Sequence, residues 1–330
     1  MPLRLPQFNV RKLALTVTVV AAVLLATIWF TPSFFVPVAL RLSYIASGVH
    51  TGETMVNGHT WPYLEAGDRK SPPMIMLHGF GTGREAMMSI MPWLDGNFRC
   101  IAPDLPGFGH HSFHDGQTHD VAFYAAELIS FADSLGVDRF DLMGTSMGGG
   151  IAAYVAARYP DRIRTLILLS PAGIQPDQQN YFMRDVERGN KPLVVRNEAD
   201  FDRVVDLAFD KNPWVPWQFR KELTARAVRN AKNLDAIVAA MQDFLRNGLA
   251  GELSKIKAPT LVLWGDRDLV TDPSMLCKFV KGIPNAKGVL INDGGHVVTD
   301  DSPEQSRRAI TEFLEEQGGL PANPLTFKRD

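Results

Sequence analysis

The sequence predicts an α/β protein, in which a mostly parallel sheet is covered by helices on both faces and carries an inserted helical cap. Short apolar segments alternate with helix-forming segments over most of the chain, and several of the apolar segments have no polar face. Strands without a polar face are typical of a parallel sheet buried on both sides. One long stretch interrupts the alternation, because it has helical patterning and no convincing strand.

Length and composition are those of an ordinary globular protein. The chain has 330 residues, of which 45% are hydrophobic and 21% charged, enough for one large core and an insertion. A formal net charge of −2 gives no electrostatic reason to expect nucleic acid as a partner. Cys100 and Cys277 lie far apart in sequence, so they indicate neither a disulfide framework nor a zinc site.

Residues 1–50 are predicted to form a membrane anchor and a linker. The apolar run 13–30 carries no charge, and three basic residues precede it, Arg4, Arg11 and Lys12. About 18 residues suffice to span a bilayer, and the basic flank favours a cytoplasmic N-terminus with the body on the periplasmic or extracellular side. The alternative is a secreted protein whose signal peptide is cleaved, which the bulky end of the run at Trp29 disfavours.

The first part of the predicted core covers residues 51–173. Asn57-Gly58 lies between two short strand-like segments and predicts a β-hairpin. The expected strands are 54–56, 60–64, 73–77, 98–102, 140–143 and 164–169. The expected helices are 84–94, 121–135 and 151–158.

Residues 174–251 are predicted to form the cap. Alternation then resumes in residues 252–318, which complete the core, and residues 319–330 form a C-terminal tail. The expected strands here are 259–264 and 288–291, and the expected helices are 273–280 and 303–316. Ligands bind open α/β sheets at the carboxyl edge of the strands, so the cap is expected to lie over that edge.

A candidate nucleophile lies between the strand 140–143 and the helix that follows it. Gly144-Thr145-Ser146-Met147-Gly148 has the pattern of a strand–turn–helix elbow, in which a strained turn exposes the serine hydroxyl. Glycines two positions before and after Ser146 avoid side-chain collisions in such a turn. The N-terminus of the following helix directs free N–H groups at a developing anion.

A serine nucleophile needs a base, and the base needs an acid that orients it. His296 follows the last strand and is the predicted base, whereas His78 fits a supporting role in His78-Gly79-Phe80-Gly81. Four further histidines, His110, His111, His114 and His119, crowd one polar loop. A metal site was considered for this loop, but its spacing matches no metal motif, so we expect a solvated loop and no metal.

The acid is expected after the strand 259–264. Asp268 is the preferred candidate, Asp266 is interpreted as a turn residue beside Gly265, and Asp293 ranks third. The resulting order is serine, aspartate, histidine, which is one of three known chain orders for such triads. The backbone N–H groups of Met147 and Phe80 are the predicted oxyanion-hole donors.

The complete set of motifs resembles the α/β-hydrolase superfamily from about residue 51 to residue 316. The motifs are His78-Gly79-Phe80-Gly81, Asp104-Leu105-Pro106-Gly107-Phe108-Gly109, Gly144-Thr145-Ser146-Met147-Gly148-Gly149, Trp264-Gly265-Asp266-Arg267-Asp268 and Gly295-His296. Together with the N-terminal segment, they are similar to membrane-anchored monoacylglycerol lipases and cold-adapted bacterial lipases. The resemblance implies the triad Ser146, Asp268 and His296, with Phe80 and Met147 as oxyanion donors.

The leading functional hypothesis is a serine carboxylic ester hydrolase that cleaves lipid-like esters through an acyl-enzyme and needs no cofactor. The expected substrate contacts are Gly79, Thr145, Trp214 and Trp217, although the two tryptophans could equally pack the cap on the body. A carbon–carbon bond hydrolase of ring-cleavage diketones is the alternative. A non-catalytic, membrane-tethered binding protein is a third hypothesis. Chain-length preference, natural substrate and oligomeric state stay open.

Overall fold

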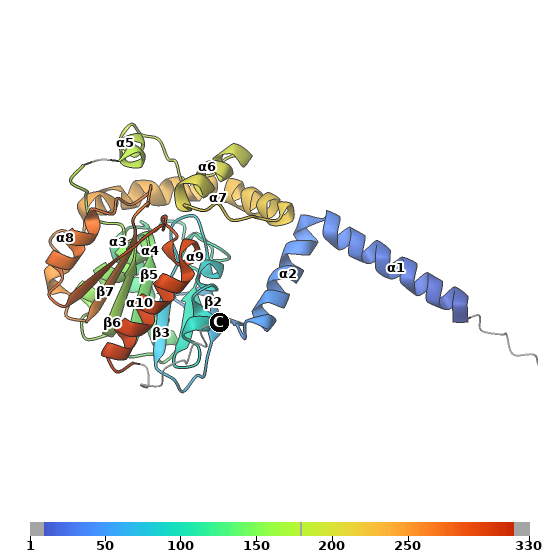
Figure 1. Cartoon of the computed structure of the whole chain (residues 1–330), viewed down its shortest axis with the longest axis horizontal. Helices are drawn as coiled ribbons and strands as arrows, with labels where there is room; N and C mark the ends of the chain where they lie inside the picture. Colours follow the sequence, from blue (N-terminus) through green and yellow to red (C-terminus); the bar gives the residue numbers. More distant parts are fainter. Residues whose placement is uncertain (1–9, 179, 320–330) are drawn as a thin grey trace, which may run out of the picture.

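The protein is built around one twisted sheet of eight strands, seen in Figure 1. The computed structural model describes residues 10–178 and 180–319. The strands are β1 (His50–Val56), β2 (His59–Ala66), β3 (Pro73–Leu77), β4 (Arg99–Pro103), β5 (Phe140–Thr145), β6 (Ile163–Leu169), β7 (Thr260–Gly265) and β8 (Ala286–Ile291). Their order in space is β1-β2-β4-β3-β5-β6-β7-β8. The pairs β1–β2 and β2–β4 are antiparallel and all others are parallel, which confirms the predicted fold class.

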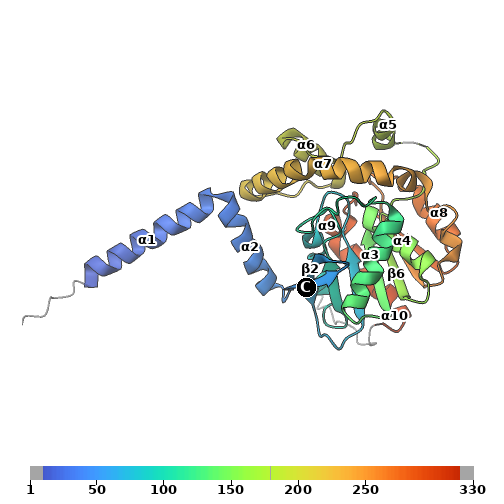
Figure 2. The same ribbon diagram turned by 180° about the vertical axis from the view of Figure 1, so that it is seen from behind.

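Helices cover both faces of the sheet. The α-helices are α1 (Val10–Phe30), α2 (Pro32–Ala46), α3 (Val121–Ser134), α4 (Met147–Arg158), α5 (Tyr181–Glu187), α6 (Glu198–Ala208), α7 (Trp217–Asn247), α8 (Met275–Gly282), α9 (Val298–Asp301) and α10 (Pro303–Glu316). On β3, Ile75 packs in the core layer with α3, α4 and α8, whereas Met76 packs in the layer with α10. This alternation is the period of two that a strand imposes, and it explains why β3 has no polar face. Figures 1 and 2 show the two layers from opposite sides.

Most expected elements of the core are present, and the hairpin turn is confirmed. Asn57 and Gly58 both have positive φ angles, 51° and 83°, as the tight turn between β1 and β2 requires. The expected helix 84–94 is wrong, because this segment contains two 3-10 turns, η1 (Arg84–Met87) and η2 (Met91–Trp93). Pro92 lacks the N–H that a continuous helix needs, and the Arg84 N–H is bound to Asp104 Oδ1 at 2.7 Å.

Three helices, α5, α6 and α7, lie over the carboxyl edge of the parallel strands (Figures 1 and 2). The long helix α7 is held on the core by the buried side chains of Ile237, Met241 and Phe244. Asn230 Nδ2 also donates to the Gly107 carbonyl at 2.8 Å. The inserted helical cap is therefore present, while the exact boundaries of core and cap at residues 174 and 251 stay a prediction.

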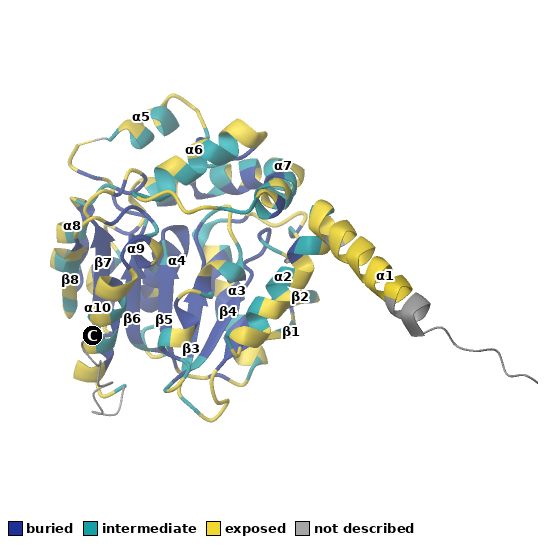
Figure 3. Cartoon of the chain, turned by 45° about the vertical axis from the view of Figure 1, so that its right-hand side comes forward, coloured by how far each residue is buried: buried dark blue, intermediate teal, exposed yellow. Residues whose placement is uncertain are grey.

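The N-terminal region forms two apolar helices rather than one straight span. Within the described residues, no single helix is both long and apolar enough to cross a membrane. The segments Leu15–Thr27 and Pro32–Ala46 meet the requirement only as a pair, and they are bent by 97°. Figure 3 shows that α1 extends away from the body with its surface exposed.

Candidate active site

Ser146 occupies a strained turn between β5 and α4. Its φ of 55° and ψ of −119° lie outside the regions that non-glycine residues favour, and such a conformation costs about 1–3 kcal/mol. A Cβ at Gly144 would lie 2.3 Å from the Gly148 carbonyl oxygen, and one at Gly148 would lie 2.4 Å from the His78 carbonyl oxygen. The two glycines of the motif are therefore required by close backbone contacts, as the sequence predicts.

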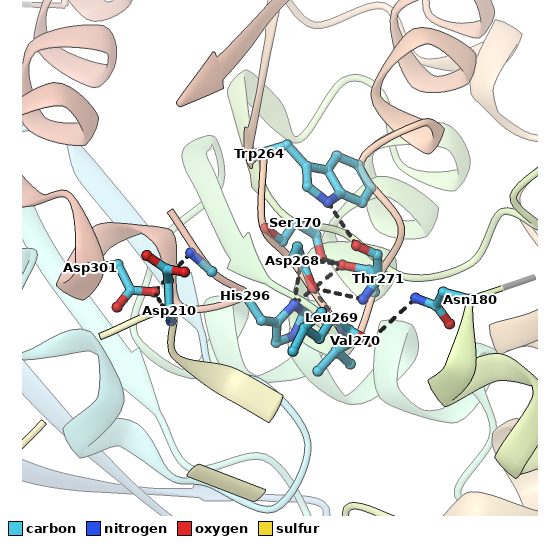
Figure 4. A network of polar contacts seen from close by, with 11 residues as sticks. Ser170, Asn180, Asp210, Trp264, Asp268, Leu269, Val270, Thr271, His296 and Asp301 are labelled. Carbon is cyan, nitrogen blue, oxygen red and sulfur yellow. Dashed lines mark hydrogen bonds and ion pairs between the residues drawn. The ribbon is translucent and has the colours of Figure 1, made fainter. Parts of the chain in front are cut away.

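The structure brings Asp268 and His296 together at the same edge of the sheet (Figure 4). His296 Nδ1 lies 2.8 Å from Asp268 Oδ2, and both side chains are buried. Asp268 Oδ1 accepts the backbone N–H groups of Val270 and Thr271 at 2.8 and 2.9 Å. The carboxylate is thus fixed in one orientation, which leaves His296 Nε2 as the nitrogen available for chemistry.

Neighbouring strands explain this meeting of distant residues. Asp268 follows β7 and His296 follows β8, and these strands pair in parallel with Gly265 opposite Ile291. A Cβ at Gly265 would lie 2.2 Å from the Gly294 carbonyl oxygen, so the two loops approach each other closely.

Asp301 in α9 holds the His296 loop from the other side. Its Oδ2 accepts from the Gly295 N–H at 2.8 Å and from the Asp210 N–H at 3.0 Å, as Figure 4 shows. Val297 N–H donates to the Ala208 carbonyl at 2.9 Å, at the end of α6. The loop that carries the histidine is therefore tied directly to the cap.

Phe80 and Met147, the predicted oxyanion donors, both line the pocket that contains Ser146. Met147 is the first residue of α4, where helix N–H groups lack partners within the helix. Gly79 lies against the elbow, since a Cβ there would be 3.4 Å from Ser146 Cβ. The structure thus places both predicted donors at the pocket that contains Ser146, and their role as oxyanion donors stays a prediction.

His78 supports the loop that carries Phe80. Leu105 N–H donates to His78 Nε2 at 3.0 Å, so the ring proton is on Nδ1, which donates to the Gly79 carbonyl at 2.8 Å. Complete burial lowers the pKa of His78 below its usual value, and the ring stays neutral. His78 is therefore a structural support for Gly79 and Phe80, which agrees with the role expected from the sequence.

An apolar pocket extends from Ser146 beneath the cap. It is lined by side chains from the core and from α5, α7 and the segment between α5 and α6. These residues include Phe80, Met147, Ile174, Phe182, Met183, Val186, Leu193, Val194, Val238, Leu245, Val270 and Met275. Polar groups are few, so the pocket suits a hydrocarbon chain whose reactive end lies at Ser146.

Ser146 and His296 are both buried, but within the described residues no hydrogen bond joins their side chains.

Trp214 and Trp217, which the sequence places among the substrate contacts, do not line this pocket. Trp214 is 86% exposed and lies just before α7, and Trp217 is 44% exposed and is the first residue of α7. The pocket instead adjoins the opposite half of α7, at Val238 and Leu245. Neither tryptophan therefore lines the pocket, and the high exposure of Trp214 also excludes it as a residue that packs the cap on the body.

The rival acids are placed away from His296. Asp266 is exposed in the turn after β7, where its Oδ1 accepts from the Gly294 N–H at 3.3 Å. Asp293 forms an ion pair with Arg267. Thr145 precedes the nucleophile and is partly buried at the end of β5. Asp268 is thus the aspartate that contacts the histidine.

The expectation of a solvated loop is wrong for three of its four histidines, whereas His110 is exposed. His111, His114 and His119 are buried, and the His114 ring stacks on His59 with centroids 3.5 Å apart. Burial lowers the pKa of His111 and of His114 to about 4. Among the described residues, no group of three or more His, Cys, Asp or Glu side chains is arranged to hold a metal ion. Aromatic residues of β2 and α3 pack on these three histidine rings, and a polar sequence pattern does not reveal such packing.

Sequence reasoning missed Thr271. Its hydroxyl donates to Asp268 Oδ2 at 2.8 Å, lies 3.2 Å from His296 Nδ1, and lines the pocket. A threonine three residues after an aspartate is a common turn partner for its carboxylate, and that spacing was the available signal.

Comparisons with known proteins agree with this geometry. The α/β hydrolase fold family matches residues 72–303. Lipase 1 of Psychrobacter immobilis is 27% identical over 271 residues, covering 80% of this chain and 84% of the relative. The monoacylglycerol lipase ABHD6 of Homo sapiens is 28% identical over 259 residues, covering 74% of this chain and 75% of the relative.

A solved structure is also similar over nearly the whole chain. A membrane phospholipase A, a bacterial virulence factor, is 32% identical and superimposes with a TM-score of 0.85. The comparison covers 94% of this chain and 100% of that chain. The family match extends over more than half of the sequence and includes Ser146 and Asp268 together with the His296 loop, so this chain belongs to the α/β hydrolase fold family.

Proposed function

We propose that this protein is a serine hydrolase of carboxylic esters with lipid-like acyl chains. The observation that carries the proposal is a strained, pocket-facing Ser146 at one end of an apolar pocket, with an oriented Asp268–His296 pair at the same sheet edge. Relatives with lipase and phospholipase names support the same class of reaction.

The proposed mechanism uses only groups of this chain. His296 Nε2 takes the proton of Ser146 as Oγ attacks the ester carbonyl, and Asp268 stabilises the imidazolium. The Phe80 and Met147 N–H groups donate to the oxyanion. His296 then protonates the leaving alcohol, and an acyl-enzyme on Ser146 remains. Water, deprotonated by His296, attacks the acyl carbonyl, the carboxylic acid leaves, and His296 returns the proton to Ser146 Oγ. Hydrogen bonds between nucleophile and base are often formed only when substrate is bound.

Membrane anchoring through the N-terminal apolar helices is part of the proposal. A lipid ester is concentrated in the bilayer, and an apolar segment of this length holds an enzyme beside such a substrate. The basic residues before the apolar run favour a body on the non-cytoplasmic side. Protease protection in right-side-out and inverted membrane vesicles tests this orientation, and cleavage of the body only in inverted vesicles would contradict it.

The first test is hydrolysis of p-nitrophenyl esters from acetate to palmitate. We expect activity that peaks at medium or long chains and is lost in Ser146→Ala, because the pocket accepts a hydrocarbon chain and the hydroxyl is the nucleophile. Ser130→Ala, on the outer surface of α3, is the matched control and should keep full activity. Activity confined to acetate, or surviving in Ser146→Ala, contradicts the proposal.

A second test separates the proposal from the two other hypotheses. A fluorophosphonate probe should label the protein at Ser146, and no labelling would favour a non-catalytic binding protein. Turnover of a ring-cleavage diketone faster than that of every ester would favour the carbon–carbon bond hydrolase instead. These outcomes do not depend on membrane association.

A further inference from the structure

Helix α2 has one face packed on the body. Val36 is 1% exposed, and the Tyr44 hydroxyl donates to Glu85 Oε1 at 2.9 Å. Phe35 packs edge-to-face on Phe219 of α7, with ring centroids 6.0 Å apart. The helix is therefore held in a defined position against the core and the cap.

The opposite face of α2 is apolar and without a partner within the described residues. Phe34, Val38, Leu42 and Ile45 are 63%, 45%, 62% and 71% exposed. Their spacing of four, four and three residues places them on one side of the helix. We call these four residues the α2 stripe. Arg41, which is also exposed, lies one residue before Leu42 on the same side.

The α2 stripe continues the apolar surface of α1. The side chains of Leu24, Leu25 and Phe30 at the end of α1 are 58%, 68% and 72% exposed, and α1 meets α2 at a bend of 97°. Because of this bend, an α1 that enters a bilayer along its normal turns α2 nearly parallel to the surface. An α2 in that position places the stripe at the level of the lipid headgroups.

Exposed tryptophans and a lysine lie at the bend and around the start of α7. Gln218 Nε2 donates to the Trp29 carbonyl at 3.3 Å, so the start of α7 adjoins the bend directly. Trp29 and Trp214 are exposed, and Lys221 on the first turns of α7 is exposed as well. Tryptophan prefers the interface between water and lipid, and lysine and arginine prefer anionic headgroups there.

We propose that the α2 stripe, with Arg41 on the same side of the helix and Trp214 just before α7, docks on the headgroup–acyl boundary of an anionic bilayer and holds the body against the membrane. The proposal rests on the membrane association in the proposed function and adds to it a specific contact surface. An interfacial helix has this composition: large apolar residues on one side and basic residues at the edge. The apolar continuity with α1 and the nearby aromatic and basic residues favour lipid over a second copy of this chain as the occupant.

The first experiment measures the depth of α2 in the full-length protein reconstituted into phosphatidylethanolamine–phosphatidylglycerol vesicles. An environment-sensitive fluorophore is attached at Ile45→Cys in a Cys277→Ser background, because Cys277 is exposed and Cys100 is buried. We expect a blue-shifted emission that is quenched by nitroxide lipids labelled near the headgroup and not by an aqueous quencher. Leu290→Cys is the matched control, since Leu290 is 50% exposed on β8 at the far edge of the sheet from α2.

The control label should be accessible to the aqueous quencher. The docking surface is overturned if the aqueous quencher reaches the Ile45 label as readily as the Leu290 label while the protein still floats with the vesicles. That result would leave the membrane anchor intact. Concentration-dependent self-quenching of the Ile45 label, without quenching by lipid, would assign the stripe to a second copy of the chain.

A second experiment connects the surface to activity. The double variant Val38→Glu/Leu42→Glu should hydrolyse a long-chain ester presented in vesicles about tenfold more slowly, because burying two such side chains contributes more than the 1.4 kcal/mol that corresponds to tenfold. The rate of the double variant on soluble p-nitrophenyl butyrate should be unchanged. The control variant Leu290→Glu should keep the wild-type rate on both the vesicle ester and the soluble ester. Equal rates on vesicles for the double variant and the wild type contradict the docking proposal. Absence of soluble-ester activity in the wild type would instead contradict the proposed function.

Discussion

At the residue scale, the hydrogen bonds of one carboxylate determine how the candidate base is presented. Asp268 accepts two backbone N–H groups on Oδ1, and on Oδ2 it contacts the Thr271 hydroxyl and His296 Nδ1. A carboxylate with both oxygens occupied cannot rotate, so His296 is held in one tautomer and orientation. Asp266 is only two residues away, but it is exposed and accepts one long bond from a backbone N–H group.

This difference predicts the outcome of a matched pair of substitutions. Asp268→Asn should lower kcat on the best p-nitrophenyl ester about 10³- to 10⁴-fold, because an amide favours the wrong histidine tautomer. Asp266→Asn should change kcat less than about threefold, since an amide oxygen still accepts the Gly294 N–H. Steady-state kinetics together with far-UV circular dichroism measure both effects. Similar losses in the two variants would rule out the specific role of Asp268.

At the scale of elements, the junction of β5 and α4 depends on glycines that touch neighbouring backbone. We expect Gly148→Ala to destabilise the protein by about 1–3 kcal/mol and to abolish ester hydrolysis, because its Cβ would lie 2.4 Å from the His78 carbonyl oxygen. Gly96→Ala is the control, since no atom lies within 4 Å of its added Cβ. Thermal unfolding and activity are measured together. A Gly148→Ala protein with wild-type stability would contradict the close approach.

The helix α7 contributes to the pocket along only one of its sides, and this predicts how acyl-chain selectivity can be changed. Val238 lines the pocket, whereas the next residue, Ala239, is exposed. Val238→Trp should reduce kcat/KM for palmitate or laurate esters at least about tenfold relative to kcat/KM for the acetate ester. The larger side chain would fill the part of the pocket that a long acyl chain occupies. Ala239→Trp should leave the ratio unchanged. A similar chain-length profile in both variants would place the acyl chain elsewhere.

At the scale of the whole molecule, buried neutral histidines make stability depend on pH. Burial lowers the pKa of His111 and His114 to about 4, below the usual value of 6.5 in an unfolded chain. Between these values the unfolded chain binds protons that the folded protein does not. Stability is therefore fully retained above pH 6.5 and is lost as the pH falls towards 4.

The free energy of unfolding should decrease by about 1.4 kcal/mol per pH unit for each of these histidines within that range. Urea unfolding at several pH values measures the slope. His114→Gln should reduce the slope by the amount that corresponds to about one proton. His50 is an exposed histidine on β1, so His50→Gln should leave the slope unchanged. An unchanged slope in His114→Gln would show that other groups cause the acid sensitivity.

Features set by local pattern and chain order follow from the sequence by itself. The elbow at Ser146, the strands without a polar face and the Asn57-Gly58 turn each depend on neighbours a few residues away. Parallel strands place their following loops at one edge, so the meeting of Asp268 with His296 could also be expected. Segment 84–94 shows where local pattern is insufficient, because Pro92 and the Asp104 carboxylate prevent a helix there.

Only the tertiary structure determines which surfaces are covered. The sequence identifies Trp214 as apolar, yet its exposure and its absence from the pocket lining depend on how α7 is laid across the sheet. The sequence of the histidine loop is polar, yet side chains of β2 and α3 bury three of its histidines. Burial is a property of contacts between residues distant in sequence, whereas period and turn chemistry are properties of adjacent ones. For that reason the elbow and the strands could be predicted, and the histidine cluster and the α2 stripe could not.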